Sequence, residues 1–295
     1  MTKLLALLGV VLFRLTVIVS GVVLTDLYQE TYQSLQSALS ATAIYNNRDD
    51  DGQRVRKAMF SFFGIRNQVT KAIKPEVEEI SLRINQIVDW LETQFNDIPR
   101  DRTFLFCGSD FLVQKDPATQ ALDYQGNGLV NTNGNPVPIS QVPAYQADLA
   151  GGDVPWWSGE RANIKGYYFT SLDDGAQTIV ICPSAFQSTA PGTYSEAVTM
   201  TTAGIKLNLV VPKSPTLLHE AFHVVLGDEF LQANDEIYGL VECVRARQDP
   251  TKARKNPENY VYFIAAMHFL LGEPAEGITT NWEFAIGVNK AMAIN

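Results

Sequence analysis

Apolar positions along the chain predict helices in its first third and short strands after it. Between Thr25 and about Asp97, apolar side chains recur every three or four residues, the period of an amphipathic helix. The polar run NNRDDDG and Pro75 divide this region into three helices. Apolar runs further along predict strands at 102–107, 167–171, 178–182 and 205–211. The Asp-Gly pair between the second and third runs predicts a hairpin.

The clearest single helix is predicted for the stretch PTLLHEAFHVVLG, which follows Ser214. Serine is a good N-cap, proline suits the first helical turn, and Gly227 suits the position just past the end. The apolar content of this stretch predicts that the helix is buried. Two more helices are expected after it, one capped by Asn234 or Asp235 and running to about Arg247, and one over 257–271.

Two histidines lie four residues apart in the predicted buried helix, His219 and His223, with Glu220 between them in an H-E-x-x-H pattern. Residues four apart share one face of a helix, with Cβ atoms about 5–6 Å apart, so both imidazoles can reach one Zn²⁺ ion. Glu220 is offset from them and can accept a proton from a water molecule beside the ion. The chain has only three histidines, and two of them have this spacing. We therefore expect a hydrolytic zinc site.

Charge and composition narrow the class of protein. The chain has 295 residues, of which 46% are hydrophobic and 19% charged, as in ordinary globular proteins. Its net charge of −9 disfavours nucleic acid and anionic membrane surfaces as partners. With a hydrolytic zinc site, protein or peptide substrates are the expected partners, and a monomer is the expected state.

The N-terminus predicts export. Lys3 precedes an apolar core, and small residues follow at Ser20 and Gly21, which is typical of a secretory signal peptide over residues 1–21. The alternative is a membrane anchor over 4–24, in which Arg14 would lie near the bilayer centre at a cost of about 2.5–3.5 kcal/mol. A secreted, extracellular protein is the favoured interpretation. The helical region that follows, 22–100, is either an integral layer or a propeptide.

The three cysteines allow one disulfide bond and one leftover thiol. Cys107 and Cys182 each end a predicted strand, and the ends of neighbouring strands can bring them together, so this is the expected pair. Cys243 lies in a predicted helix and is expected to be buried.

A catalytic zinc site usually has three protein ligands, and the residues alone leave the third one open. Asp235 follows His223 after a loop long enough to return to the site. Glu242 would give a site built from two helices, and His268 is the only other histidine, although its apolar neighbours favour a core position.

A family resemblance bears on this choice. HEAFH followed by D-x-x-Y-G, from Asp235 to Gly239, resembles the motif of the aspzincins, a group of secreted fungal zinc proteases that includes deuterolysin and lysine-specific metalloendopeptidases. The runs NPENYVYF and TIVICPSAF are similar to further stretches of that family. The resemblance covers about residues 101–272. The chain departs from the family at Leu231 and Gln232, which replace a Gly-Thr pair, and at Val261, where lysine-specific members carry a second acid.

The resemblance implies an α+β fold with a zincin-like metallopeptidase domain at 101–272, built from a small sheet and active-site helices. The N-terminal helical region precedes this domain and a tail at 273–295 follows it. The implied metal ligands of one Zn²⁺ ion are His219, His223 and Asp235, with Glu220 as general base. Tyr238 would stabilise the oxyanion. Glu258 matches the family's acidic residue that receives a basic substrate side chain after the scissile bond.

The sequence therefore predicts a secreted zinc endopeptidase that hydrolyses peptide bonds with metal-activated water. The strand at 178–182 is expected to pair with extended substrate, as edge strands do with peptides. The alternative function is a non-catalytic secreted binding protein that retains the zincin fold. A second alternative keeps the enzyme and uses Glu242 or His268 as the third ligand.

Overall fold

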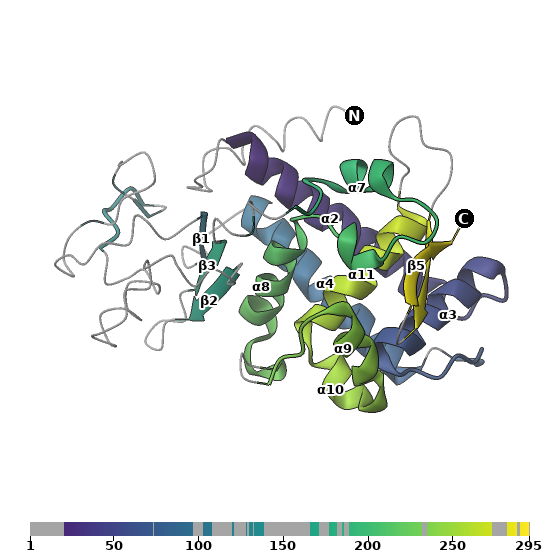
Figure 1. Cartoon of the computed structure of the whole chain (residues 1–295). Coiled ribbons are helices and arrows are strands. Elements are labelled where there is room, and N and C mark those ends of the chain that lie inside the picture. The colour runs from purple at the N-terminus through teal and green to yellow at the C-terminus, as the bar shows by residue number, and fades with distance from the viewer. Residues whose placement is uncertain are drawn as a thin grey trace. The chain divides into compact units, whose positions relative to one another are not determined.

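A computed structural model of the chain describes residues 21–72, 74–96, 103–107, 120, 128, 130–131, 133–138, 166–170, 177–181, 185, 189–231, 235–272, 282–287 and 290–294. These residues are mainly helical, with a few short strands (Figure 1). Two compact units can be distinguished, one formed by Met1–Asp26 and Asp89–Ser188, the other by Leu27–Val88 and Thr189–Asn295. This division differs from the boundary near residue 100 that the change in sequence texture predicts.

The first unit contains a three-stranded sheet made of β1 (Thr103–Cys107), β2 (Gly166–Thr170) and β3 (Gln177–Ile181). The strand order is β1-β3-β2, with β3 parallel to β1 and antiparallel to β2, so the predicted hairpin is confirmed. Because β3 is paired on both sides, it is the central strand. The expectation that the strand at 178–182 offers a free edge to substrate is therefore wrong.

The predicted disulfide falls partly outside the described residues. Cys107 ends β1 and lies opposite Ile181 of β3, so the two predicted strand ends are neighbours. Cys182 itself and the signal region 1–20 are among the residues that the structure does not describe, so the bond and the signal peptide stay predictions. Cys243 is buried and carries a free thiol, as expected. Among the described helices, none combines the length and apolar content needed to cross a membrane.

The second unit is built from helices of both halves of the chain. Its longer helices are α2 (Gly21–Ala43, from Leu27 onward), α3 (Asp50–Phe63), α4 (Pro75–Asn96, as far as Val88), α8 (Pro215–Leu226) and α11 (Pro257–Leu271). Its shorter elements are α7 (Tyr194–Met200), η2 (Leu207–Leu209), η3 (Gly227–Glu229), α9 (Leu240–Arg245), η4 (Ala246–Gln248) and α10 (Pro250–Arg254). A hairpin of β4 (Glu283–Gly287) and β5 (Lys290–Ile294) completes it.

Helix α11 is the centre of the second unit, where it packs against α8 and α3 (Figure 1). Its apolar residues lie on all sides, and nearly all are buried, as expected for a helix surrounded by others. From α3, the fully buried ring of Phe63 contacts Tyr260 and Phe263 of α11, with ring centroids 4.9 and 5.3 Å apart. Helices from the N-terminal third of the chain therefore share one core with the region that carries H-E-x-x-H.

Polar contacts reinforce this shared core. The half-exposed carboxylate of Glu79 on α4 forms ion pairs with Arg83 and with Arg254 of α10, both 2.9 Å long. The Arg83 guanidinium donates to the Arg254 carbonyl oxygen and lies over the Phe230 ring, 5.1 Å from its centroid. Loss of residues 27–88 would therefore expose apolar rings and leave buried polar groups without their partners.

Helix α8 forms where the sequence predicts it, with one local difference. Pro215 occupies the first turn, and Gly227 ends the helix with a φ of +50°, a conformation that L side chains rarely adopt. Ser214 stands at the N-cap position, but its buried side chain makes no capping hydrogen bond. The helix is held mainly by its apolar face, which includes the buried Leu217, Leu218 and Phe222.

Two predicted elements differ from the observed ones. The stretch 205–211 is not a strand but contains the short helix η2, which buries Leu207 and Val210 and leaves Leu209 55% exposed. A spacing of three between buried residues suits a 3₁₀ turn better than a strand. The helix predicted from Asn234 or Asp235 begins only at Leu240, and residues 236–238 before it form no helix. This difference determines the composition of the site.

Candidate metal centre

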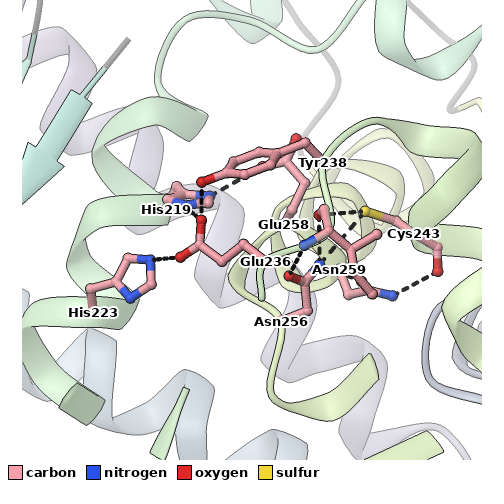
Figure 2. Close-up of polar contacts among 9 residues, drawn as sticks. His219, His223, Glu236, Tyr238, Cys243, Asn256, Glu258 and Asn259 are labelled. Carbon is pink, nitrogen blue, oxygen red and sulfur yellow. Dashed lines mark hydrogen bonds and ion pairs between the residues drawn. The ribbon is translucent and has the colours of Figure 1, made fainter. Parts of the chain in front are cut away.

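Three side chains of the second unit converge as possible metal ligands: His219 and His223 of α8 and Glu236 of the following loop (Figure 2). One ligand atom from each lies within 4.8 Å of the others. The Nε2 atoms of His219 and His223 are 3.6 and 2.5 Å from the two Glu236 carboxylate oxygens. The three side chains are only 11%, 4% and 3% exposed. Among the described residues, this is the one cluster with a donor set suited to a metal ion.

The donor set fits zinc. Two imidazole nitrogens and one carboxylate form a common ligand set of catalytic zinc sites, which leave the fourth position open. Tetrahedral bonds of about 2.0–2.2 Å place donors about 3.4 Å apart. The His219–Glu236 separation of 3.6 Å is close to this spacing, and the His223–Glu236 pair, at 2.5 Å, would have to open by about 0.9 Å to hold the ion. The chemistry of the three donors therefore fits zinc.

The electrostatics of the cluster favour a positive charge at its centre. Burial by itself would lower the pKa of His219, but hydrogen bonds to Glu236 and Glu258 outweigh it and raise this pKa to about 10. Burial would likewise raise the pKa of Glu236, yet its hydrogen bonds to His219, His223 and Tyr238 hold this pKa well below its usual range. A buried carboxylate that stays ionised needs a cation beside it, either a protonated imidazole or a metal ion.

Glu258 orients His219 from behind. This residue lies in the first turn of α11, and its carboxylate is 3.2 Å from Nδ1 of His219. An ionised carboxylate only accepts hydrogen bonds, so Nδ1 carries the proton and donates it, and Nε2 faces Glu236. Metal-binding histidines are commonly held in this way, because the second nitrogen fixes both ring orientation and tautomer. The predicted role of Glu258 in receiving a basic substrate side chain stays a prediction.

Glu220 lies on the same helix as the two histidines and is 6% exposed. Burial is the main cause that raises its pKa to about 7, and the nearby carboxylates of Glu236 and Glu258 act in the same direction, against the opposing charge of His219. A carboxyl group with a pKa near neutrality can both accept and release a proton under physiological conditions. Glu220 therefore has the electrostatic environment of a general base.

Tyr238 covers one side of the cluster. Its ring lies nearly parallel to the His219 imidazole, with centroids 5.8 Å apart and an interplanar angle of 17°. Its hydroxyl donates a hydrogen bond to the Glu236 carboxylate (Figure 2). Burial and this carboxylate raise the pKa of the Tyr238 phenol, so the hydroxyl remains a proton donor. The side chain is still 55% exposed, so one end of it faces the surroundings of the site.

The position predicted for Asp235 is taken by its neighbour. Asp235 is exposed and does not belong to the cluster, whereas Glu236 brings its carboxylate to both imidazoles. The contacts of Glu236 with both imidazoles and of the Tyr238 ring with His219 show that these two side chains face α8. The prediction of Asp235 rests on the length of the loop after His223 and on the family resemblance, whereas the cluster contains Glu236.

The other two candidates for a third ligand lie elsewhere. The Glu242 side chain is 53% exposed and pairs with Arg245 of the same helix. His268 lies near the end of α11, where its Nδ1 is 3.0 Å from the Ser37 hydroxyl. Its ring packs against Tyr194, with centroids 4.2 Å apart, as expected for a core histidine.

Sequence reasoning missed Glu236 and the buried Asn256. Asn256 exchanges two hydrogen bonds with the backbone of Ile237, between Glu236 and Tyr238. The run NPENY gives only a partial signal for Asn256. Asparagine before proline predicts the start of a helix, and the pattern does not indicate a contact with the loop. The partner of Asn256 lies 19 residues earlier in the chain, beyond the reach of any local pattern.

Comparison with known proteins adds no assignment. Protein-family profiles gave no matching family for this chain, and a search of curated proteins gave no match.

Proposed function

We propose that this protein is a secreted zinc-dependent endopeptidase with a zincin-like site. His219, His223 and Glu236 would hold the ion, and Glu220 would act as general base. The observation that carries the proposal is the convergence of two buried imidazoles from adjacent helical turns with a carboxylate from the next segment. The motif resemblance to the aspzincins supports the same reaction, although it assigns the third ligand to Asp235 rather than Glu236.

The chain's own residues suit hydrolysis of a peptide bond. A zinc ion at this site would supply Lewis-acid chemistry for attack of water on the carbonyl. Glu220 would take the proton of the attacking water and pass it to the leaving amine, a role that a pKa near 7 favours. Tyr238 has one hydroxyl proton, which it donates to Glu236 here, and it would turn that proton to the oxyanion when substrate is bound. A preference for a basic residue after the scissile bond draws no support from the contact between Glu258 and His219.

The first experiment measures zinc and peptide cleavage in the same preparations. Wild type is expected to bind one zinc ion per chain and to cleave members of a broad peptide library. Glu220→Gln should retain the zinc and lose cleavage by at least about 100-fold, because general-base catalysis contributes that much or more. Glu242→Gln, which alters an exposed glutamate of the same unit, should behave like wild type. Zinc binding without cleavage by wild type would instead indicate a zinc-containing binding protein.

The identity of the third ligand has its own test. Glu236→Gln should weaken zinc binding by more than about 100-fold, a larger loss than outer-shell substitutions cause. Asp235→Asn removes one negative charge at the adjacent position and should leave affinity within about threefold of wild type. The reverse result would restore Asp235 as the ligand that the family motif implies.

A further inference from the structure

The loop that carries Glu236 and Tyr238 is bound by the buried carboxamide of Asn256, and the Cys243 thiol makes a longer hydrogen bond of 3.4 Å to the Ile237 carbonyl oxygen (Figure 2). The amide nitrogen of Ile237 donates to Oδ1 of Asn256 at 2.9 Å. Nδ2 of Asn256 donates back to the Ile237 carbonyl oxygen, also at 2.9 Å. Both backbone groups of the residue between the proposed ligand and the tyrosine are therefore bound by a single side chain.

Only a carboxamide can make this pair of bonds. It offers an acceptor oxygen and a donor nitrogen in one plane, which matches the N–H and C=O groups of one residue. A carboxylate lacks the donor, and a hydroxyl is too short to reach both groups. Because Ile237 is fixed at both of its polar groups, rotation of this segment is restricted. Its two neighbours, Glu236 and Tyr238, are then kept on the side that faces the histidines.

A role in helix capping does not explain this residue. Asn256 stands at the N-cap of α11, where an asparagine side chain usually accepts from a backbone N–H of the first turn. Here the side chain makes no capping hydrogen bond. Its hydrogen-bonding capacity is directed instead to the loop, which lies 19 residues away in the sequence.

The carboxamide is itself held in place by a second one. Nδ2 of Asn256 also donates to Oδ1 of Asn259 at 2.7 Å, and both side chains are fully buried. Asn259 in turn donates to the carbonyl oxygens of Phe62 on α3 and Cys243 on α9, at 2.6 and 2.9 Å. Contacts with α3 and α9 thus fix the orientation of Asn259, the side chain that holds the Asn256 carboxamide.

We propose that Asn256 is a positioning residue for the metal centre, which sets the third ligand by binding the backbone of Ile237. The expected effect on zinc affinity rests on the proposed function. The hydrogen bonds that anchor the loop do not depend on any ion. Asn256 contacts neither the imidazoles nor the Glu236 carboxylate in the described contacts, so its effect on the ion passes through the loop.

Hydrogen exchange tests the anchoring in metal-free protein. Asn256→Ser is the informative variant, because serine caps helices as well as asparagine does and is too short to hold Ile237. Amide-resolved exchange should show a protected Ile237 N–H in wild type and loss of that protection in the variant. Thr193→Ala removes the side-chain cap of α7, in the same unit, and should leave Ile237 protected. Protection of Ile237 that persists in Asn256→Ser would overturn the proposal.

Zinc titration tests the consequence. Asn256→Ser should raise the zinc Kd by roughly 10- to 100-fold, the loss typical of residues that orient a ligand. In a Glu236→Gln background the same substitution should change the Kd by less than about threefold, since its route to the ion has been removed. An equal loss in both backgrounds would mean that Asn256 acts through general stability, which contradicts the proposal.

Failure of the proposed function has a different signature. If wild type binds no zinc, the metal centre is wrong, and the exchange comparison still decides whether Asn256 anchors the loop. If zinc binds and Ile237 is unprotected in wild type, the metal centre stands and the role of Asn256 is wrong.

Discussion

The histidines of the second unit occupy two contrasting environments. His219 and His223 of α8 lie among the carboxylates of Glu220, Glu236 and Glu258, and the pKa of His219 is raised to about 10. His268 lies near the end of α11 beside the Tyr194 ring and the Ser37 hydroxyl, and burial lowers its pKa to about 4. The surroundings of His219 therefore favour a positive charge, and the surroundings of His268 favour the neutral imidazole.

The difference teaches that burial alone does not define a functional histidine. All three side chains are largely enclosed, but only two of them face ionised groups that make a cation favourable. Helix α11 serves both environments, because Glu258 in its first turn orients His219 and His268 belongs to its last turn. A single helix thus contributes an orienting carboxylate to the site and a packed ring to the core.

The strongest way to break this comparison is to remove one histidine from each environment. His223→Ala should abolish stoichiometric zinc binding, because only two of the three proposed donors remain. His268→Ala should keep about one zinc ion per chain, even if it lowers stability. Metal analysis of purified, folded variants distinguishes the outcomes. Loss of zinc from folded His268→Ala would mean that His268 is also needed for zinc binding, and the proposed difference between the two environments would be wrong.

The scaffold shared by both environments is tested by truncating Phe63, which is fully buried against α11. Phe63→Ala should lower the free energy of unfolding by about 3–5 kcal/mol, the usual cost of a large cavity in a core. Phe60→Ala is the matched control, because that ring lies on the same helix and is 41% exposed. Its cost should stay below about 1 kcal/mol, including the loss of its contact with Arg247. Chemical denaturation of metal-free protein measures both values.

The neutral state of His268 predicts how stability depends on pH. Its pKa is about 4 in the folded protein against 6.5 in the unfolded chain, so the unfolded chain binds more protons between these values. The contribution is fully present above pH 6.5 and is lost as the pH falls toward 4, by at most about 3 kcal/mol. Urea unfolding of metal-free wild type and His268→Gln should show a shallower pH dependence for the variant. Parallel curves would mean that His268 titrates normally in the folded protein.

The smallest predicted effect concerns the orienting carboxylate. Glu258→Gln keeps the size of the side chain and weakens the hydrogen bond to Nδ1 of His219. Zinc affinity should fall by about tenfold, at the low end of outer-shell substitutions. Competition with a chromophoric chelator measures the change, and Glu242→Gln provides an exposed control. Unchanged affinity would mean that Glu258 does not affect the metal centre, and that α8 and the loop with Glu236 form it alone.

Much of the local structure follows from local sequence. The start of α4 at Pro75, α8 with its terminal Gly227, α11, and the hairpin of β2 and β3 are all predicted from apolar period, proline, glycine and turn residues. These signals are reliable because the interactions that they describe span only a few residues. Short apolar patterns are ambiguous. At 205–211 the structure has the short helix η2 instead of the expected strand, and Leu207 and Val210, three residues apart, are buried.

The candidate site could be predicted only in part for the same physical reason. The pairing of His219 with His223 is a property of one helix, so spacing along the chain was sufficient. Asp235 and Glu236 are adjacent acids, and no local pattern distinguishes which of them faces the histidines. The preference for Asp235 came from the length of the loop after His223 and from the family resemblance, and the distinction depends on how the loop is bound.

The sequence by itself determined the two histidines, the acid between them and the helix that presents them, because an α-helix converts a spacing of four residues into a shared face. Tertiary structure alone decided that Glu236 completes the cluster and that Glu258 orients His219. Both outcomes depend on contacts between segments distant in the chain: Asn256 binds Ile237, which lies beside Glu236, and the packing of α11 against α8 brings Glu258 to His219.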